Sequence, residues 1–156
     1  MTELNPRSTA SIAGHPIHPM LIPFPIAFFV GALAVDIAFS QTGDPFWSSA
    51  GRWLLGAGLA TAALAALAGL TDFLGDGRIR QLRAAWLHMI GNVTVVLIEA
   101  INLWQRIEVG DGFVVPTGLV LSLAATLLLL FNGWKGWEMV YRHHVGIADT
   151  PGDPRR

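Results

Sequence analysis

Residues 21–40 read LIPFPIAFFVGALAVDIAFS, and Asp36 is the only charged side chain among them. A helix needs about 20 predominantly apolar residues to cross the hydrocarbon core of a membrane. Three further apolar runs of sufficient length follow at 51–74, 84–105 and 116–141. The four runs predict four membrane-spanning helices, and therefore an all-α fold organised as a four-helix transmembrane bundle.

The composition of the whole chain agrees with this interpretation. Hydrophobic residues make up 53% of the 156 residues, charged residues only 13%, and the mean hydropathy is +0.51. A soluble domain carries about 25% charged residues, so membrane lipid is the first expected partner. The net charge of −1 provides no basic surface for nucleic acid. The absence of cysteine excludes disulfides and iron–sulfur ligation by this chain.

Positively charged residues are concentrated in the loop between the second and third predicted helices and near the two chain ends. They are Arg7, Arg78, Arg80, Arg83, Lys135, Arg142, Arg155 and Arg156. Basic segments stay in the cytoplasm by the positive-inside rule, so both termini are expected there. We expect residues 15–147 to form the transmembrane domain, and residues 1–14 and 148–156 to be disordered tails.

A paired histidine–proline motif, His15-Pro16-Ile17-His18-Pro19, stands directly before the first apolar run. A residue before proline is disfavoured in the α region, so the motif predicts extended or polyproline II backbone. In that conformation His15 and His18 would point the same way, roughly 9 Å apart. Two imidazoles on one edge of a stiff segment suggest a binding site. The alternative is a rigid segment at the membrane boundary with two interfacial histidines.

All five histidines lie toward the predicted cytoplasmic face. His15 and His18 precede the first helix, His88 lies about one turn into the third, and His143 and His144 follow the fourth. Neutral imidazole is a good ligand for haem iron and for transition metals, and the one-sided placement favours a single site. His88 is the strongest ligand candidate because it lies inside a span. Its partner could be His18, His15 or His143.

The third predicted helix also carries a narrow polar stripe, within about 80° of arc at helical periodicity. The stripe consists of His88, Asn92, Glu99, Asn102 and Arg106. Glu99 lies about 16 Å along the axis from His88, and an acid at that depth normally faces the bundle interior. Asn92 and Glu99 are therefore candidates to support a cofactor and its ligands. Near the cytoplasmic end, Asp72 and Glu138 are expected to pair with Arg78, Arg83 or Arg142.

Three functional interpretations follow from these residues. Haem needs one or two axial ligands in an apolar slot, which His88 and a second histidine would supply. A non-haem Zn, Cu or Fe site would need three or four ligands. It would draw on His15, His18, Asp72, His88, Glu138 and His143. The third interpretation is an accessory or structural subunit. The sequence contains no Gly-x-Ser-x-Gly motif, so no catalytic residues are assigned.

Three motifs resemble those of the bacterial membrane-protein family called domain of unknown function 2231. They are His15-Pro16-Ile17-His18-Pro19-Met20-Leu21 with Pro25-Ile26-Ala27, then Leu87-His88, and Gly133-Trp134-Lys135-Gly136-Trp137-Glu138-Met139-Val140-Tyr141-Arg142-His143 with Val145-Gly146. The resemblance covers about residues 14–147. The family pattern has glycine after the final histidine, where this chain has His144.

The family is similar to four-helix transmembrane b-type cytochromes, which implies a haem b-binding electron carrier more than a stand-alone enzyme. His15, His18, His88 and His143 are then the candidate haem ligands. A quinone or a redox protein is the implied partner. Such cytochromes place histidines near both membrane faces, whereas this chain has none near the outer face, so any haem is expected in the inner half. Exposed small residues also make a homo-oligomer plausible.

Overall fold

The computed structural model describes residues 5–148, and within that range four helical segments are long and apolar enough to cross a membrane. The elements are β1 (Ser11–Ile12), β2 (His15–Pro16), α1 (Ile17–Leu21), α2 (Pro23–Thr42), α3 (Pro45–Gly75), α4 (Gly77–Arg80), α5 (Arg83–Val109), η1 (Asp111–Phe113), η2 (Val114–Gly118) and α6 (Leu119–Tyr141). The predicted all-α, four-helix transmembrane fold is confirmed. The structure also contains one short antiparallel hairpin, in which β1 pairs with β2 before the first long helix.

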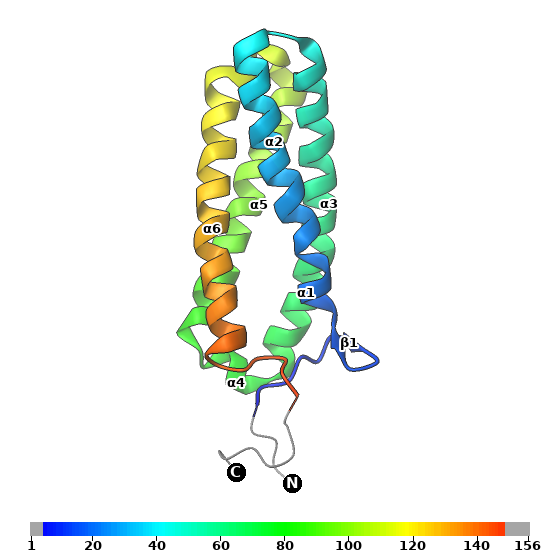
Figure 1. Ribbon diagram of the computed structural model, residues 1–156, viewed down its shortest axis with the longest axis vertical. Coiled ribbons are helices and arrows are strands. Elements are labelled where there is room, and N and C mark those ends of the chain that lie inside the picture. The colour runs from blue at the N-terminus through cyan, green and yellow to red at the C-terminus, as the bar shows by residue number, and fades with distance from the viewer. Residues whose placement is uncertain (1–4, 149–156) are drawn as a thin grey trace.

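The four long helices run up and down along one long axis (Figure 1). α2 packs against α3 and α6, while α5 packs against the same two helices, so each long helix has two neighbours. Short connections make consecutive helices antiparallel. The first and last described residues and α4 lie together at one end of the bundle, and the α2–α3 and α5–η1 turns lie at the other.

The helices end where turn residues occur in the sequence. Gly43 closes α2 with a left-handed φ of 66°, a conformation that glycine adopts without steric cost. Asp44 then caps α3, because its side chain accepts a hydrogen bond from the Phe46 amide at 2.9 Å. The last helix was expected from Pro116, yet α6 begins at Leu119. Val115 is extended (φ −123°, ψ 126°), as the steric demand of a following proline favours.

The bundle interior is formed by small and apolar side chains. Phe29, Leu55, Val95 and Ala125 are buried in one cluster. Gly58 allows the Phe29 ring to lie against α3, since a Cβ at that glycine would stand 2.5 Å from the ring. In a membrane, small residues of this kind let helices approach closely and gain dispersion contacts.

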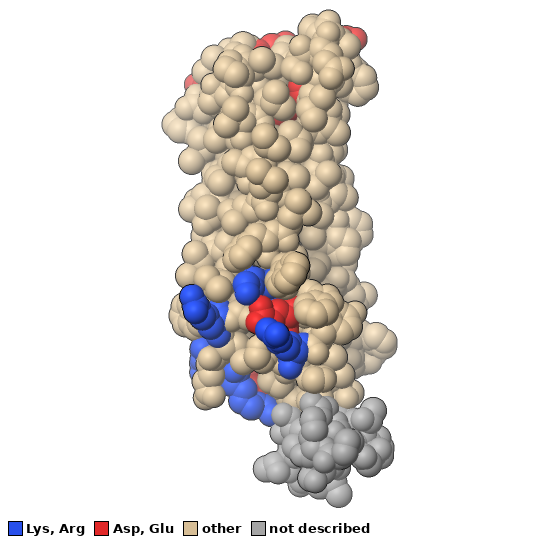
Figure 2. Space-filling model, turned by 60° about the vertical axis from the view of Figure 1, so that its left-hand side comes forward, with Lys and Arg blue, Asp and Glu red and all other residues tan. Residues whose placement is uncertain are grey.

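The outer surface of the bundle is apolar, in the manner of a protein surrounded by lipid. Large exposed side chains line all the long helices, and they include Trp53, Trp86, Trp104, Trp134 and Trp137. Charged side chains gather toward the two ends, and the band between them is uncharged on the face shown in Figure 2. This distribution matches an uncharged hydrocarbon band with aromatic residues near both interfaces.

The segment before α1 differs from the predicted disordered tail over residues 1–14. Residues 5–10 lie against the end of the bundle, where the Ser8 hydroxyl and the Ala10 amide bond to Asp72 at 2.9 and 2.7 Å. The Arg7 amide bonds to Asp76 at 2.9 Å. The carboxylates of Asp72 and Asp76 therefore hold this segment in place, and the composition of the segment does not reveal these contacts. Residues 1–4 of that tail, and 149–156 of the predicted C-terminal tail, lie outside the described residues.

The prediction of extended or polyproline II backbone through the paired histidine–proline motif is confirmed at His15 and is wrong at His18. His15 belongs to the strand β2, and His18 lies inside the helix α1. Pro19 falls in the first turn of α1, where the missing N–H has no helical partner to lose. The helix therefore forms despite the usual preference of a residue before proline. The two histidines consequently sit in different structural elements.

Candidate functional site

Two of the five histidines meet inside the bundle. The His18 ring, from α1, and the His88 ring, from α5, have centroids 6.1 Å apart and planes at 82°. Both side chains are shielded in part from the surroundings. His18 was one of three partners that the sequence offered for His88, and the structure brings these two rings together.

Each of these imidazoles docks on a neighbouring helix in the same way. His18 Nδ1 lies 2.8 Å from the Ala65 carbonyl of α3, and a Cβ at Gly69, one turn further on, would stand 2.8 Å from that nitrogen. His88 Nδ1 lies 3.0 Å from the Asn132 carbonyl of α6. Gly136, again one turn further, leaves room beside His88 Cε1. A glycine four residues after the carbonyl has no side chain to block it, so an imidazole from another helix can reach the carbonyl oxygen.

The docking determines which ring nitrogen is free. A backbone carbonyl only accepts hydrogen bonds, so the Nδ1 of each neutral ring carries the proton and donates it. The Nε2 of His18 and of His88 then keeps its lone pair. Hydrogen bonding of Nδ1–H to a carbonyl is the usual support for a histidine that ligates metal through Nε2, because it fixes the tautomer and orients the ring.

Asn92, predicted to support the ligands, bonds to the backbone of His88 and to Asn132, the residue whose carbonyl holds the His88 ring. Its side-chain amide donates to the His88 carbonyl at 2.8 Å, and its oxygen accepts from the Asn132 amide at 3.5 Å. Asn132 is 1% exposed, and within residues 5–148 its Oδ1 has no partner. It fits there because Gly91 has no side chain to collide with it.

The other predicted ligands are not assembled around this pair. His15 is exposed, and its Nδ1 bonds to the Ala13 carbonyl at 3.0 Å. His143 follows α6, where its amide bonds to the Glu138 carbonyl at 3.2 Å. Asp72 binds the segment before α1, as described above. In the described part of the chain, no three His, Cys, Asp or Glu residues are placed to share a metal ion. The six-residue non-haem set is therefore not brought together.

The pairing expected of the acids near this end is half right. Glu138 does pair with Arg142, at 3.3 Å, and more closely with Lys135, at 2.8 Å. Asp72 binds backbone and hydroxyl groups in place of an arginine.

His144, the extra histidine, adopts a left-handed φ of 54°. Only glycine takes up this conformation freely, so the backbone at His144 is strained.

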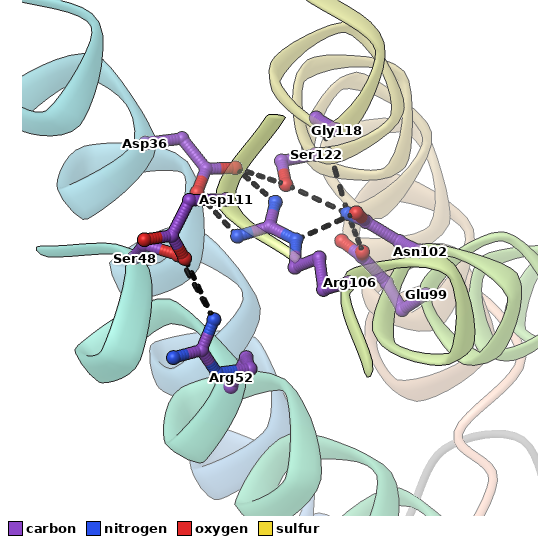
Figure 3. A network of polar contacts seen from close by, with 9 residues as sticks. All are labelled: Asp36, Ser48, Arg52, Glu99, Asn102, Arg106, Asp111, Gly118 and Ser122. Atoms are coloured by element: carbon purple, nitrogen blue, oxygen red, sulfur yellow. Dashed lines mark hydrogen bonds and ion pairs between the residues drawn. The ribbon is translucent and has the colours of Figure 1, made fainter. Parts of the chain in front are cut away.

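A second polar site lies toward the opposite end of the bundle, around a buried ion pair (Figure 3). Asp36 of α2 and Arg106 of α5 form two parallel bonds of 2.7 and 2.6 Å. Asp36 is 0% exposed and Arg106 is 1% exposed. The Arg106 guanidinium lies close to Gly51 and Gly118, which have no side chains to occupy its place. Bidentate geometry and full enclosure make this a strongly coupled pair.

Hydrogen bonds extend the ion pair to three further side chains, on α5 and α6. The Arg106 Nε donates to Asn102 at 2.9 Å, and the Ser122 hydroxyl of α6 donates to Asp36 at 2.7 Å. The Asn102 amide donates to Ser122 at 3.0 Å and to Glu99 Oε2 at 2.9 Å. Glu99 is thus part of this network and does not support the His88 ring. The inward orientation predicted for the stripe is confirmed.

Three residues cover this network at its end of the bundle (Figure 3). Asp111 accepts hydrogen bonds from the Ser48 hydroxyl at 2.5 Å and from Arg52 at 2.9 Å. Ser48 is 0% exposed. No role is predicted for these three residues from the sequence. Their signal was a serine one turn before an arginine in a segment otherwise poor in polar groups.

The fold and both sites can be set beside known proteins. A family model described as "Predicted membrane protein (DUF2231)" matches residues 14–149. No curated protein and no solved structure gives a significant match. Because the family match includes all four spans, the histidine pair and the buried ion pair, the chain belongs to this family of predicted membrane proteins, DUF2231.

Proposed function

We propose that this chain is a membrane-embedded electron carrier that holds haem b through His18 and His88. The observation that carries the proposal is the repeated docking of the two rings. The Nδ1 of each ring is hydrogen-bonded to a backbone carbonyl of a neighbouring helix, and a glycine lies one turn after that carbonyl on the neighbouring helix. One such arrangement satisfies a buried histidine. Two of them, with the rings facing each other, favour a pair of ligands for one iron.

The donor set fits the group. His18 and His88 would hold the iron through the Nε2 atoms that their Nδ1–H bonds leave free. Their ring centroids lie 6.1 Å apart, so the two rings come from different helices to one place. Imidazoles on facing helices of an apolar bundle are a usual way to hold a haem. Glu99, once a candidate to support this site, belongs to the other network.

When bound, haem supplies a centre that accepts and releases one electron. The chain contributes the rest. The Nδ1–H bonds to Ala65 and Asn132 fix the two rings and raise the basicity of their free nitrogens. The surrounding helices shield the two rings in part, which would favour haem retention over loss to water. A quinone or a redox protein at the nearby membrane surface would exchange electrons with it.

The charge distribution supports an orientation for this carrier. Basic side chains gather at one end of the bundle (Figure 2), and the first and last described residues lie at that end (Figure 1). Basic segments are retained in the cytoplasm. We therefore place both termini in the cytoplasm, the protein in the bacterial inner membrane and the haem in its inner half. The acids Asp44, Glu108 and Asp111 lie at the other end.

The test is the visible absorption spectrum of protein purified from cells grown with ample haem precursor. We expect a Soret band, and α and β bands after reduction with dithionite. His88→Ala should lose them, whereas the matched control His15→Ala should keep them, because His15 is exposed and bonded locally. A folded, helical wild type without a Soret band contradicts the proposal. Elemental analysis of the same sample would then identify a non-haem metal or leave an accessory role.

A further inference from the structure

We propose that Glu99 binds an exchangeable proton within the membrane, so that the buried network around Asp36 and Arg106 is electrically neutral. The ligand of this site is the proton itself, held on a carboxyl group enclosed by the bundle. The inference uses none of the residues of the histidine pair and does not depend on haem.

The hydrogen bonds of Glu99 are too few for an ionised carboxylate. Its side chain is 0% exposed. Oε2 accepts from the Asn102 amide at 2.9 Å, and within residues 5–148 the buried Oε1 has no hydrogen-bond partner. An ionised carboxylate needs donors at both oxygens when water is excluded, whereas a neutral carboxyl with one unpaired oxygen costs much less to bury.

The charges around Glu99 lead to the same conclusion. Both terminal nitrogens of Arg106 face the two oxygens of Asp36, so the positive charge is already matched. Arg52, the basic residue of α3 at this end, is bonded to Ser48 and Asp111.

No ionisable side chain occurs on α6 between residues 119 and 134. An ionised Glu99 would therefore add an unmatched negative charge inside the bilayer, where an unpaired charge is strongly disfavoured.

Asn102 connects this carboxyl group to the ion pair. Its amide donates to Glu99, and its oxygen accepts from Arg106. A change in the charge of Asp36 should therefore change the protonation state of Glu99. If Asp36 loses its charge, Arg106 needs another anion, and Glu99 is the acid that shares a hydrogen-bonded neighbour with it. Release of the Glu99 proton restores neutrality.

Infrared spectroscopy of the purified full-length protein at neutral pH tests the proposal. Wild type should show the carbonyl stretch of a protonated carboxyl group, shifted in D₂O and lost in Glu99→Gln. The control Glu138→Gln should leave this band unchanged, because Glu138 is paired with Lys135 and Arg142. Loss of carboxylate bands, in place of the carbonyl band, in Glu99→Gln would show an ionised Glu99 and overturn the proposal.

Two further measurements keep the test decisive. In Asp36→Asn the band should disappear, and its persistence contradicts the charge compensation. Wild-type protein, which needs no variant to fold, can be treated with dicyclohexylcarbodiimide, a reagent that modifies protonated carboxyl groups in apolar surroundings. We expect the modification on the peptide that contains Glu99, with a yield that falls as the pH rises. Modification of other acids alone would contradict the proposal.

Discussion

Replacement of Arg106 by methionine should destabilise the bundle more than any single change on its lipid-facing surface. The substitution keeps much of the length and volume of the side chain but removes the guanidinium. Asp36 then stays 0% exposed with the Ser122 hydroxyl as its remaining donor among those described above. Asn102 also loses the donor to its oxygen. The cost arises from a buried acid without its counter-charge.

The magnitude follows from two independent considerations. Removal of one partner from a buried ion pair costs about 3–5 kcal/mol. A lone acid in the middle of a membrane helix costs about 2.5–3.5 kcal/mol. The individual hydrogen bonds contribute less, about 0.6 kcal/mol each inside membrane proteins. We therefore expect Arg106→Met to lower the free energy of unfolding by about 3 kcal/mol.

The assay is unfolding in mixed micelles of mild detergent and sodium dodecyl sulfate, followed by far-ultraviolet circular dichroism. The double variant Arg106→Met with Asp36→Asn should recover about half of the loss or more, since a buried pair replaced at both positions by neutral groups often costs little. If the single variant is as stable as wild type, or the double variant recovers nothing, burial of an unmatched charge does not explain this network.

Gly69→Ala should lower haem retention, because the new Cβ would stand 2.8 Å from the His18 ring. The measurement is haem absorbance per protein chain, and Gly133→Ala is the control because a Cβ there meets nothing within 4 Å. The Arg78 side chain holds the pKa of Asp76 below its usual range, with help from two backbone amides. The stability gained is therefore complete above the unfolded carboxyl pKa of about 3.9 and lost as the pH falls further. Asp76→Asn should flatten that acid dependence of the melting temperature. His144→Gly should raise the free energy of unfolding by roughly 0.5–1 kcal/mol by relieving a left-handed φ, and an unchanged denaturation midpoint would argue against strain there.

The helices could be predicted from the sequence because each depends on a local property. Length and apolar composition identify a span without knowledge of its neighbours, and the turn residues identify its ends. The same applies to the inward face of α5. Glu99, Asn102 and Arg106 share one side of a helix by periodicity alone, and a charged residue in a membrane must turn away from lipid.

The partners of these residues could not be predicted in the same way. Asp36 was noted as an acid in the first span, but its pairing with Arg106 depends on the rotation of α2 against α5, which periodicity does not determine. The histidine pair was left open for a related reason. Sequence placed His18 and His143 near the same membrane face, and only the helix α1 turns His18 toward α3 and His88.

The segment before the first span was predicted least well. The proline rule applied to each histidine separately, but Pro19 falls where a helix tolerates it. Ser8 and Ala10 have no pattern that marks them as partners of Asp72, since that contact depends on the chain folding back across the bundle end. Contacts of this kind join segments far apart in sequence and leave no periodic signal.

The most direct test of the histidine-pair account is the ratio of haem to protein in two matched variants, His18→Ala and His143→Ala. Both residues lie near the same end and both were ligand candidates in the sequence, but His18 faces His88 with its ring docked on α3. The account predicts that purified His18→Ala has lost its bis-histidine spectrum and most of its haem, whereas His143→Ala retains the wild-type ratio. Full haem occupancy with an unchanged spectrum in His18→Ala, or its loss in His143→Ala alone, would contradict it.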